Sequence, residues 1–226
     1  MTHSPHPVLS RLDHSLLAPT VTRAELERGC QDALELGVAA LCIVPYFVPF
    51  AAAALRGSGV RTCTVVGFPH GNISAEQKLR EAELALGRGA HEIDVVVNLS
   101  QVLSDDWPEV ETEIGALTML THQAGARLKW ILETCYLGDA RIERLCTIAS
   151  EHRVDWVKTS TGFGSAGATV EHVGLLRRSC PLTVEVKASG GIRTLAEVER
   201  YLRLGASRIG TSRTTQIAAE LAAAGR

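Results

Sequence analysis

The stretch Val154-Asp-Trp-Val-Lys-Thr-Ser-Thr-Gly-Phe163 combines a short apolar strand with a glycine-containing loop, and it places Lys158 inside the strand. Strands of parallel sheets that are covered on both faces are usually near-continuous apolar runs. A lysine is almost never fully buried without a partner, so Lys158 is unusual there. Either its ammonium group reaches solvent at the end of the strand, or the protein uses a buried amine.

The use of lysine elsewhere in the chain favours the second interpretation. Of the 23 basic residues, only four are lysines, namely Lys78, Lys129, Lys158 and Lys187. Lys78 lies in a polar helical segment and needs no special explanation, whereas the other three lie in apolar, strand-like runs. Arginine stays protonated in proteins, but a desolvated lysine can become a neutral amine that forms a Schiff base with a carbonyl. We therefore expect a lysine nucleophile.

A short apolar strand, a helix and a glycine recur along the chain, and this repetition predicts the fold. Capping boxes at 22–25, 74–77 and 194–197 indicate helix starts. Eight strands are expected, at 12–17, 40–44, 62–67, 91–98, 128–133, 154–160, 182–187 and 207–211. Alternating strands and helices imply a parallel sheet, and eight pairs in this length favour a closed (β/α)8 TIM barrel of the α/β class. We expect one domain over 1–226, with 1–8 as an N-terminal extension.

Composition argues against several classes of protein. The formal net charge is −2, and no basic stretch is dense enough to indicate nucleic-acid or anionic-membrane binding. No apolar run approaches the ~20 residues of a membrane helix, and the N-terminus lacks a secretory pattern. The six cysteines and eight histidines show no metal-binding spacing, so we expect neither a metal nor another cofactor. Reduced, mostly buried cysteines indicate a cytoplasmic protein.

Three charged residues in the predicted strands are candidates for chemistry, which in such barrels takes place where the strands end. Asp94 is either a structural ion-pair partner of a barrel lysine or a general acid/base. Two lysines on adjacent strands repel each other by about 4 kcal/mol at ~4 Å, on the order of 3 pKa units. We assign Lys158 as the nucleophile and Lys187, expected to end the seventh strand, as its protonated neighbour. We interpret Lys129 as structural, or as paired with Asp94 or with Glu133 at the end of the fifth strand.

Glycine-containing loops follow strands six to eight, at 161–164, 189–191 and 210–212. Glycine lets backbone N–H groups approach a phosphate closely, and Arg193 could add a charge, although each loop alone is more simply a tight turn. The segment Gly162-Phe-Gly-Ser-Ala-Gly167 also matches the dinucleotide pattern G-x-G-x-x-G. That pattern normally opens the first unit of its fold, whereas five strand–helix pairs precede it here.

Four separated motifs resemble the deoxyribose-phosphate aldolase family, and the resemblance runs from about residue 9 to the end of the chain. They are Leu-Asp-His-Ser-Leu-Leu (12–17), Glu-Ile-Asp-Val-Val-Val-Asn (92–98), Asp-Trp-Val-Lys-Thr-Ser-Thr-Gly-Phe (155–163) and Val-Lys-Ala-Ser-Gly-Gly-Ile-Arg-Thr (186–194). The resemblance implies a metal-independent class I aldolase of deoxyribonucleotide catabolism. Such an enzyme reversibly cleaves 2-deoxy-D-ribose 5-phosphate to D-glyceraldehyde 3-phosphate and acetaldehyde. It also implies a homo-oligomer, either a dimer or a tetramer.

The resemblance also implies roles for individual residues. Lys158 would form the Schiff base, Lys187 would lower its pKa, and Asp94 would transfer protons. The positions that match phosphate-contacting loops are Gly162, Gly190, Gly191, Gly210 and Ser212. The positions expected to line the substrate pocket are Asp13, Ser15, Cys42 and Thr159.

The chain departs from the family pattern at three places. Phe163 stands where some members have a phosphate-binding lysine, and Arg213 follows Ser212 where a small residue is common. Both changes affect the expected phosphate subsite. The sequence ends at Arg226 without the tyrosine that assists proton transfer in some members, which concerns the proton route rather than the reaction class.

Two other functions stay open at this point. An isomerase or epimerase of the phosphosugar-barrel type would use Asp94 or Glu133 as a base without forming an imine. A degenerate barrel would bind a sugar phosphate as a sensor without turning it over. Reductive trapping of an imine on Lys158 would distinguish the aldolase from both.

Overall fold

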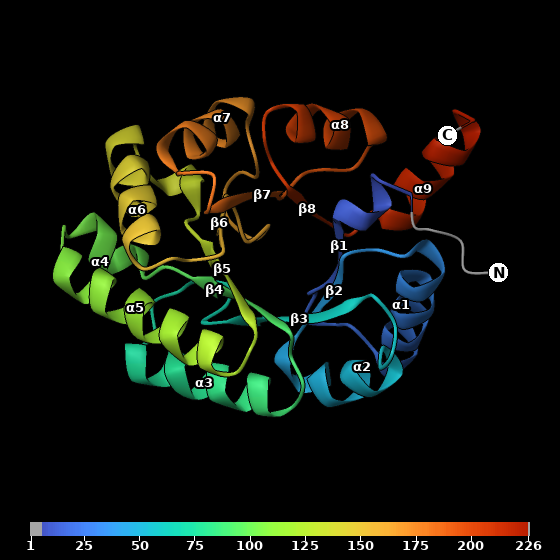
Figure 1. Ribbon diagram of the computed structural model, residues 1–226, viewed down its shortest axis with the longest axis horizontal. Coiled ribbons are helices and arrows are strands. Elements are labelled where there is room, and N and C mark those ends of the chain that lie inside the picture. The colour runs from blue at the N-terminus through green and yellow to red at the C-terminus, as the bar shows by residue number, and fades with distance from the viewer. Residues whose placement is uncertain (1–5, 226) are drawn as a thin grey trace.

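Eight parallel strands close into a barrel that helices surround (Figure 1). The computed structural model describes residues 6–225, and within them each strand pairs with the next in sequence, while β1 pairs with β8 to close the ring. The predicted TIM barrel is confirmed. The strands are β1 (Leu12–Leu16), β2 (Ala40–Ile43), β3 (Arg61–Val66), β4 (Glu92–Val96), β5 (Arg127–Ile131), β6 (Trp156–Lys158), β7 (Glu185–Ser189) and β8 (Arg208–Thr211).

The helices form a ring outside the strands in Figure 1. The three predicted capping boxes are present at Thr22, Ser74 and Thr194, each of which accepts from the backbone N–H three residues later. None of the helices in the described part combines the length and apolar character needed to cross a membrane. The helices are α1 (Arg23–Leu36), α2 (Val48–Ala54), α3 (Ala75–Gly87), α4 (Leu99–Leu103), α5 (Trp107–Gln123), α6 (Asp139–Glu151), α7 (Val170–Ser179), α8 (Leu195–Arg203) and α9 (Thr214–Ala223).

The seventh strand differs most from its predicted range. It is predicted at 182–187 but runs over Glu185–Ser189, because the apolar residue Leu182 lies in a turn in which Val184 N–H donates to the carbonyl of Pro181. Lys187 is therefore in the middle of β7, and its predicted place at the end of the strand is wrong. Of the predicted N-terminal extension, residues 1–5 lie outside the described residues, and a 3-10 turn at Leu9–Arg11 leads into β1.

Side chains along the strands alternate between an outer apolar core and the inside of the barrel. On β2, Leu41 and Ile43 belong to the continuous core that also includes the buried helix faces, whereas Cys42 belongs to a separate small cluster. On β4, Ile93 belongs to the outer core, and the buried Asp94 follows it. The alternation therefore turns the charged residues of the strands into the barrel, where they form the site described below.

All four lysines of the chain are buried, including Lys78. Its Nζ donates to Glu113 Oε1 of α5 at 2.6 Å and to the carbonyl of Val96 at 2.8 Å. The interpretation of Lys78 as an ordinary helical lysine is wrong, because it shares the buried face of α3 with the small residues Ala82 and Ala85. Burial lowers the pKa of Lys78 and raises that of Glu113, although each partner opposes the shift.

Removing one member of this pair should strongly destabilise the protein, because the other charge would stay buried without a partner. We expect Lys78→Met to reduce the free energy of unfolding in urea by about 3–5 kcal/mol. The double variant Lys78→Met/Glu113→Leu should recover most of the loss, because both buried charges are then gone. Arg80→Met, which removes one partner of an exposed pair with Glu83, is the control and should change stability little. A Lys78→Met variant as stable as this control would contradict the assignment.

Candidate active site

One buried carboxylate joins three lysines in the middle of the barrel. Asp94 of β4 accepts hydrogen bonds from Lys129 of β5 at 2.8 Å, from Lys158 of β6 at 2.6 Å and from Lys187 of β7 at 2.7 Å. Strand register brings them together, since Asp94 lies beside Lys129 and Lys158 lies beside Lys187. Lys158 and Lys187 both donate to the same atom, Asp94 Oδ2, so they share one negative charge.

Two further carboxylates and an arginine complete this group, which we call the ion cluster. Asp13 of β1 accepts from Lys187 and, at 2.7 Å, from Arg208 of β8. Glu92 of β4 pairs with Lys129 at 2.6 Å and with Arg208 at 3.0 Å. Three carboxylates thus face four cations, so the ion cluster carries one more positive than negative charge.

The ion pairs fix which groups are charged. Burial raises the pKa values of Asp13 and Asp94, but the surrounding cations outweigh it and hold both well below the ordinary range. Burial lowers the pKa of Lys187, but the carboxylates of Asp13 and Asp94 outweigh it and raise the pKa above its ordinary value. The pKa of Lys129 is raised in the same way, with Asp94 as the largest opposing cause. Asp94 therefore rests as a carboxylate, and Lys187 and Lys129 rest as ammonium groups.

A pocket of about 620 Å³ opens above the ion cluster, where β1, β6, β7 and β8 end. Of the four lysines, all within the described residues, Lys158 alone lines this pocket. Lys187, Lys129 and Asp94 lie beneath it, with side chains that are almost fully buried. The arrangement offers a single amine to a ligand and keeps the other charges out of reach.

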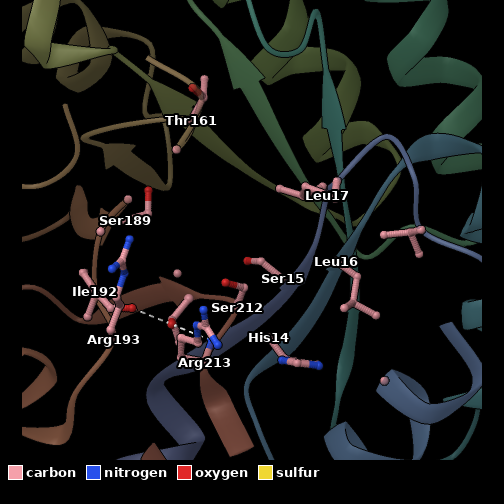
Figure 2. Close-up of a pocket in the computed structure, with 18 of the residues that line it drawn as sticks. His14, Ser15, Leu16, Leu17, Thr161, Ser189, Ile192, Arg193, Ser212 and Arg213 are labelled. Carbon is pink, nitrogen blue, oxygen red and sulfur yellow. Dashed lines mark hydrogen bonds between the residues drawn. The ribbon is translucent and has the colours of Figure 1, made fainter. Parts of the chain in front are cut away.

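The polar lining of the pocket comes mainly from β1 and the loops after β7 and β8 (Figure 2). Figure 2 shows the hydroxyls of Ser15 and Ser212 pointing into the pocket, with Arg193 and Arg213 nearby and the apolar Leu17 on the other side. Pairing of β1 with β8 explains why Ser15 and Ser212 come together. Several predicted residues line the pocket: Lys158, Ser15, Gly162, Gly190, Gly191, Gly210 and Ser212.

Three other predicted residues are buried and do not line the pocket. Asp13 belongs to the ion cluster, and Cys42 is fully buried beside its register partner Cys63 on β3. Thr159 is also fully buried, where its hydroxyl donates to the carbonyl of Ser189 at 3.2 Å. These three residues lie behind the pocket lining, and their role in substrate binding stays a prediction.

Glycines let the loops after β6 and β7 touch each other. Gly190 has φ +86°, a conformation that side chains rarely adopt. A Cβ atom added at Gly167 would lie 2.1 Å from the carbonyl oxygen of Gly190, so only glycine fits there. The last glycine of the G-x-G-x-x-G match thus serves this contact between loops in a closed barrel, and the dinucleotide alternative has no open sheet to support it.

Glu133 anchors the loop that follows β6. It lies two residues beyond β5 with φ 50°, and its carboxylate accepts from both the backbone N–H and the hydroxyl of Thr161. Burial raises the pKa of Glu133, although the hydrogen bonds from Thr161 oppose the shift. The suggested pairing of Lys129 with Glu133 is not found, whereas its pairing with Asp94 is.

Glu92 and Arg208 are members of the ion cluster that the sequence analysis missed. The sequence could have indicated Glu92, because it precedes Asp94 by two residues on the same strand and therefore faces the same side of the sheet. Arg208 is the register partner of Lys187, which only knowledge of the strand pairing reveals.

Two groups of buried residues have a spacing that could hold a metal ion, Cys42–Cys63–Asp94 and Asp13–Cys63–Glu92. The ammonium group of Lys129 already lies 3.2 Å from Cys63 Sγ and 2.8 Å from Asp94 Oδ1. A cation of the protein itself thus occupies the space between these ligand atoms.

The ion cluster predicts a specific acid sensitivity. Because the folded-state pKa values of Asp13 and Asp94 lie below their unfolded values, their stabilisation is complete above about pH 4 and is lost as the pH falls further. The Asp13→Asn variant should therefore have a lower Tm at pH 7 and a shallower decrease of Tm in acid than the wild type. Asp105→Asn, which alters an exposed carboxylate paired with Arg141, is the control. An Asp13→Asn variant with the full wild-type acid dependence would show that Asp13 is not held ionised by its partners.

Comparisons with known proteins agree with this geometry. The family model described as DeoC/LacD family aldolase matches residues 8–214. A deoxyribose-phosphate aldolase of Rhodopirellula baltica is 49% identical over 215 residues, which cover 95% of this chain and 89% of the relative. Among solved structures, a putative deoxyribose-phosphate aldolase from Coccidioides immitis has a TM-score of 0.91 and 35% identity, covering 97% of this chain and 88% of the other. The deoxyribose phosphate aldolase of Aeropyrum pernix, described as having a unique tetrameric structure, has a TM-score of 0.90 and 32% identity over 97% of this chain and 93% of its own. With its barrel, its pocket lysine and these matches, the chain belongs to the DeoC/LacD family of aldolases.

Proposed function

We propose that this protein is a class I deoxyribose-phosphate aldolase, which reversibly cleaves 2-deoxy-D-ribose 5-phosphate to D-glyceraldehyde 3-phosphate and acetaldehyde. The names of its relatives support the substrate. The observation that carries the mechanism is that Lys158 reaches the pocket while its ion-pair partner Asp94 lies beneath the pocket floor. An amine with one face toward a ligand and the other toward a carboxylate can form a Schiff base.

In the first step, the Nζ atom of Lys158 attacks the aldehyde carbon C1 of the open-chain sugar, and water leaves to give an imine. The amine must first release a proton, and the carboxylate of Asp94, 2.6 Å away, is the nearest acceptor. Lys187 donates to the same oxygen and therefore competes for this negative charge. Lys158 therefore does not have the charge of this oxygen to itself.

In the second step, the protonated imine accepts the electron pair of the C2–C3 bond. The C2–C3 bond breaks, the hydroxyl on C3 loses its proton and becomes the aldehyde of glyceraldehyde 3-phosphate, and an enamine of C1 and C2 stays on Lys158. Protonation and hydrolysis of the enamine then release acetaldehyde. Asp94 is fully buried and does not line the pocket, so in our proposal it exchanges protons through water or through the nitrogen on Lys158.

The phosphate group of the substrate fits the side of the pocket formed by the loops after β7 and β8. Among the described residues, neither Arg193 nor Arg213 has an ion-pair partner, and both line the pocket. Arg213 directly precedes α9, whose first turn adds a favourable dipole. Phe163 is half exposed at the pocket rim and packs edge-on against Phe68, so the charge comes from the arginines. Binding energy from this end of the substrate orients C1 toward Lys158.

We also propose a homo-oligomer and a cytoplasmic location for this single-domain protein. The tetramer described for the Aeropyrum pernix relative supports the oligomer. The six cysteines are all free, which agrees with a reducing compartment.

Reductive trapping tests the proposal. The protein is incubated with acetaldehyde, the imine is reduced with borohydride, and the peptides are mapped by mass spectrometry. We expect one ethyl group on Lys158 and cleavage of deoxyribose 5-phosphate by the untreated enzyme. Lys158→Met should lose both the adduct and the turnover, whereas the double variant Lys78→Met/Glu113→Leu, which removes a lysine remote from the pocket without leaving Glu113 unpaired, should keep the adduct. Turnover of a sugar phosphate without any adduct would favour an isomerase, and binding without turnover would favour a sensor.

A further inference from the structure

A second hollow lies at the end of the barrel opposite the catalytic pocket. It is formed by the turns after α2 and α3, where β3 and β4 begin, and its volume is about 590 Å³. Four of the side chains that line it carry or can carry positive charge: Arg56, Arg61, Arg88 and His91. None of the described acidic side chains lines the hollow. We call this surface the basic hollow.

The three guanidinium groups of the basic hollow are not neutralised by other parts of the protein. Across the described residues, none of the three forms an ion pair. The local sequence explains this, because residues 36–75 and 84–91 contain no aspartate or glutamate. Elsewhere on the surface, exposed arginines such as Arg23 and Arg80 pair with a glutamate three or four residues away on their own helix.

A purely structural explanation is that Arg56 and Arg88 compensate the helix dipoles, because they follow or cap the C-terminal ends of α2 and α3. The hydrogen bonds of these two arginines do not support the helix-dipole explanation. In the described part of the chain, neither guanidinium donates a hydrogen bond to a helix carbonyl. Arg177 differs from them, since it donates to the carbonyls of Cys180 and Pro181, just after α7, at 3.0 and 2.7 Å.

Two features give the basic hollow a defined shape. His91 accepts the backbone N–H of Thr62 through Nδ1 at 3.1 Å, so the proton of its neutral ring is on Nε2 and the ring is held in place. Gly89 has φ +100°, and a Cβ atom added there would lie 2.9 Å from that of Ala52. Glycine at this position lets the turn after α3 close against α2, so the cationic side chains converge from two different units of the barrel.

We propose that the basic hollow binds a diphosphate group, either as free pyrophosphate or as part of a nucleoside diphosphate. A planar guanidinium matches two phosphate oxygens at once, and such charge-assisted hydrogen bonds are the strong ones. Three guanidinium groups and an imidazole suit a ligand with more charge than a single phosphate monoester. The apolar residues beside them, Pro49, Ala52, Leu55 and Val60, offer a surface for a nucleoside base.

Isothermal titration with pyrophosphate, and separately with a nucleoside diphosphate, tests this proposal at constant ionic strength. The variant Arg56→Gln/Arg88→Gln should lose affinity by about tenfold per arginine. The matched control Arg153→Gln/Arg178→Gln changes two exposed arginines outside both pockets by the same charge and should bind as the wild type does. If the nucleoside diphosphate binds more tightly than pyrophosphate, the apolar residues of the basic hollow contact the base. If the two bind equally, the protein recognises only the diphosphate.

Hydrogen exchange separates the basic hollow from the catalytic pocket, which also fits phosphate. Added pyrophosphate should slow amide exchange in the turns at 55–61 and 87–91 of the wild type and not of the Arg56→Gln/Arg88→Gln variant, which should keep wild-type aldolase activity. The proposal is overturned if the wild type does not bind, if both double variants weaken binding equally, or if the protected amides belong only to the loops after β7 and β8.

Discussion

The carboxylate of Asp94, shared by three buried lysines, is the interaction on which the rest of the site depends. A barrel interior excludes water, so each cation placed there needs a carboxylate partner. Asp94 holds Lys129, Lys158 and Lys187 within 2.6–2.8 Å, and the outer acids Asp13 and Glu92 balance the cations farther from the pocket. The cations outnumber the carboxylates by one, and Lys158 is the one of these cations that lines the pocket.

Residues inside the barrel have different roles at different depths. Its lower layer is ionic and fully packed. Its upper layer is a pocket walled by glycine loops, serines and two arginines that have no ion-pair partner within residues 6–225. Lys158 crosses the boundary between them, because it is the last residue of β6, whereas β7 continues past its register partner Lys187 to Ser189. Gly210 makes room for this packing, since a Cβ atom there would lie 3.1 Å from Lys187 Cε. The same strand alternation that buries the apolar core thus also positions the nucleophile.

Much of this could be predicted from sequence, because the signals were local. The capping boxes specify helix starts, and lysines among apolar strand residues mark the inside of the barrel. The features that were missed depend on partners distant in sequence. Lys78 looks ordinary in its polar helix, and only packing against Glu113 of α5 makes it a buried ion. Arg208 joins the ion cluster only through the pairing of β8 with β7 and β1. The start of β7 was misplaced because Leu182 has strand-like hydrophobicity but lies in an exposed turn.

The pH dependence of kcat/KM for deoxyribose 5-phosphate cleavage in a Lys187→Met variant tests the central claim most directly. Without Lys187, no second cation competes for Asp94 Oδ2, so that oxygen pairs with Lys158 alone. We predict that the rising limb of the profile moves to higher pH by about one unit or more, while the double variant Lys78→Met/Glu113→Leu keeps the wild-type profile. A Lys187→Met enzyme with an unshifted rising limb would contradict the claim that the shared carboxylate controls the nucleophile.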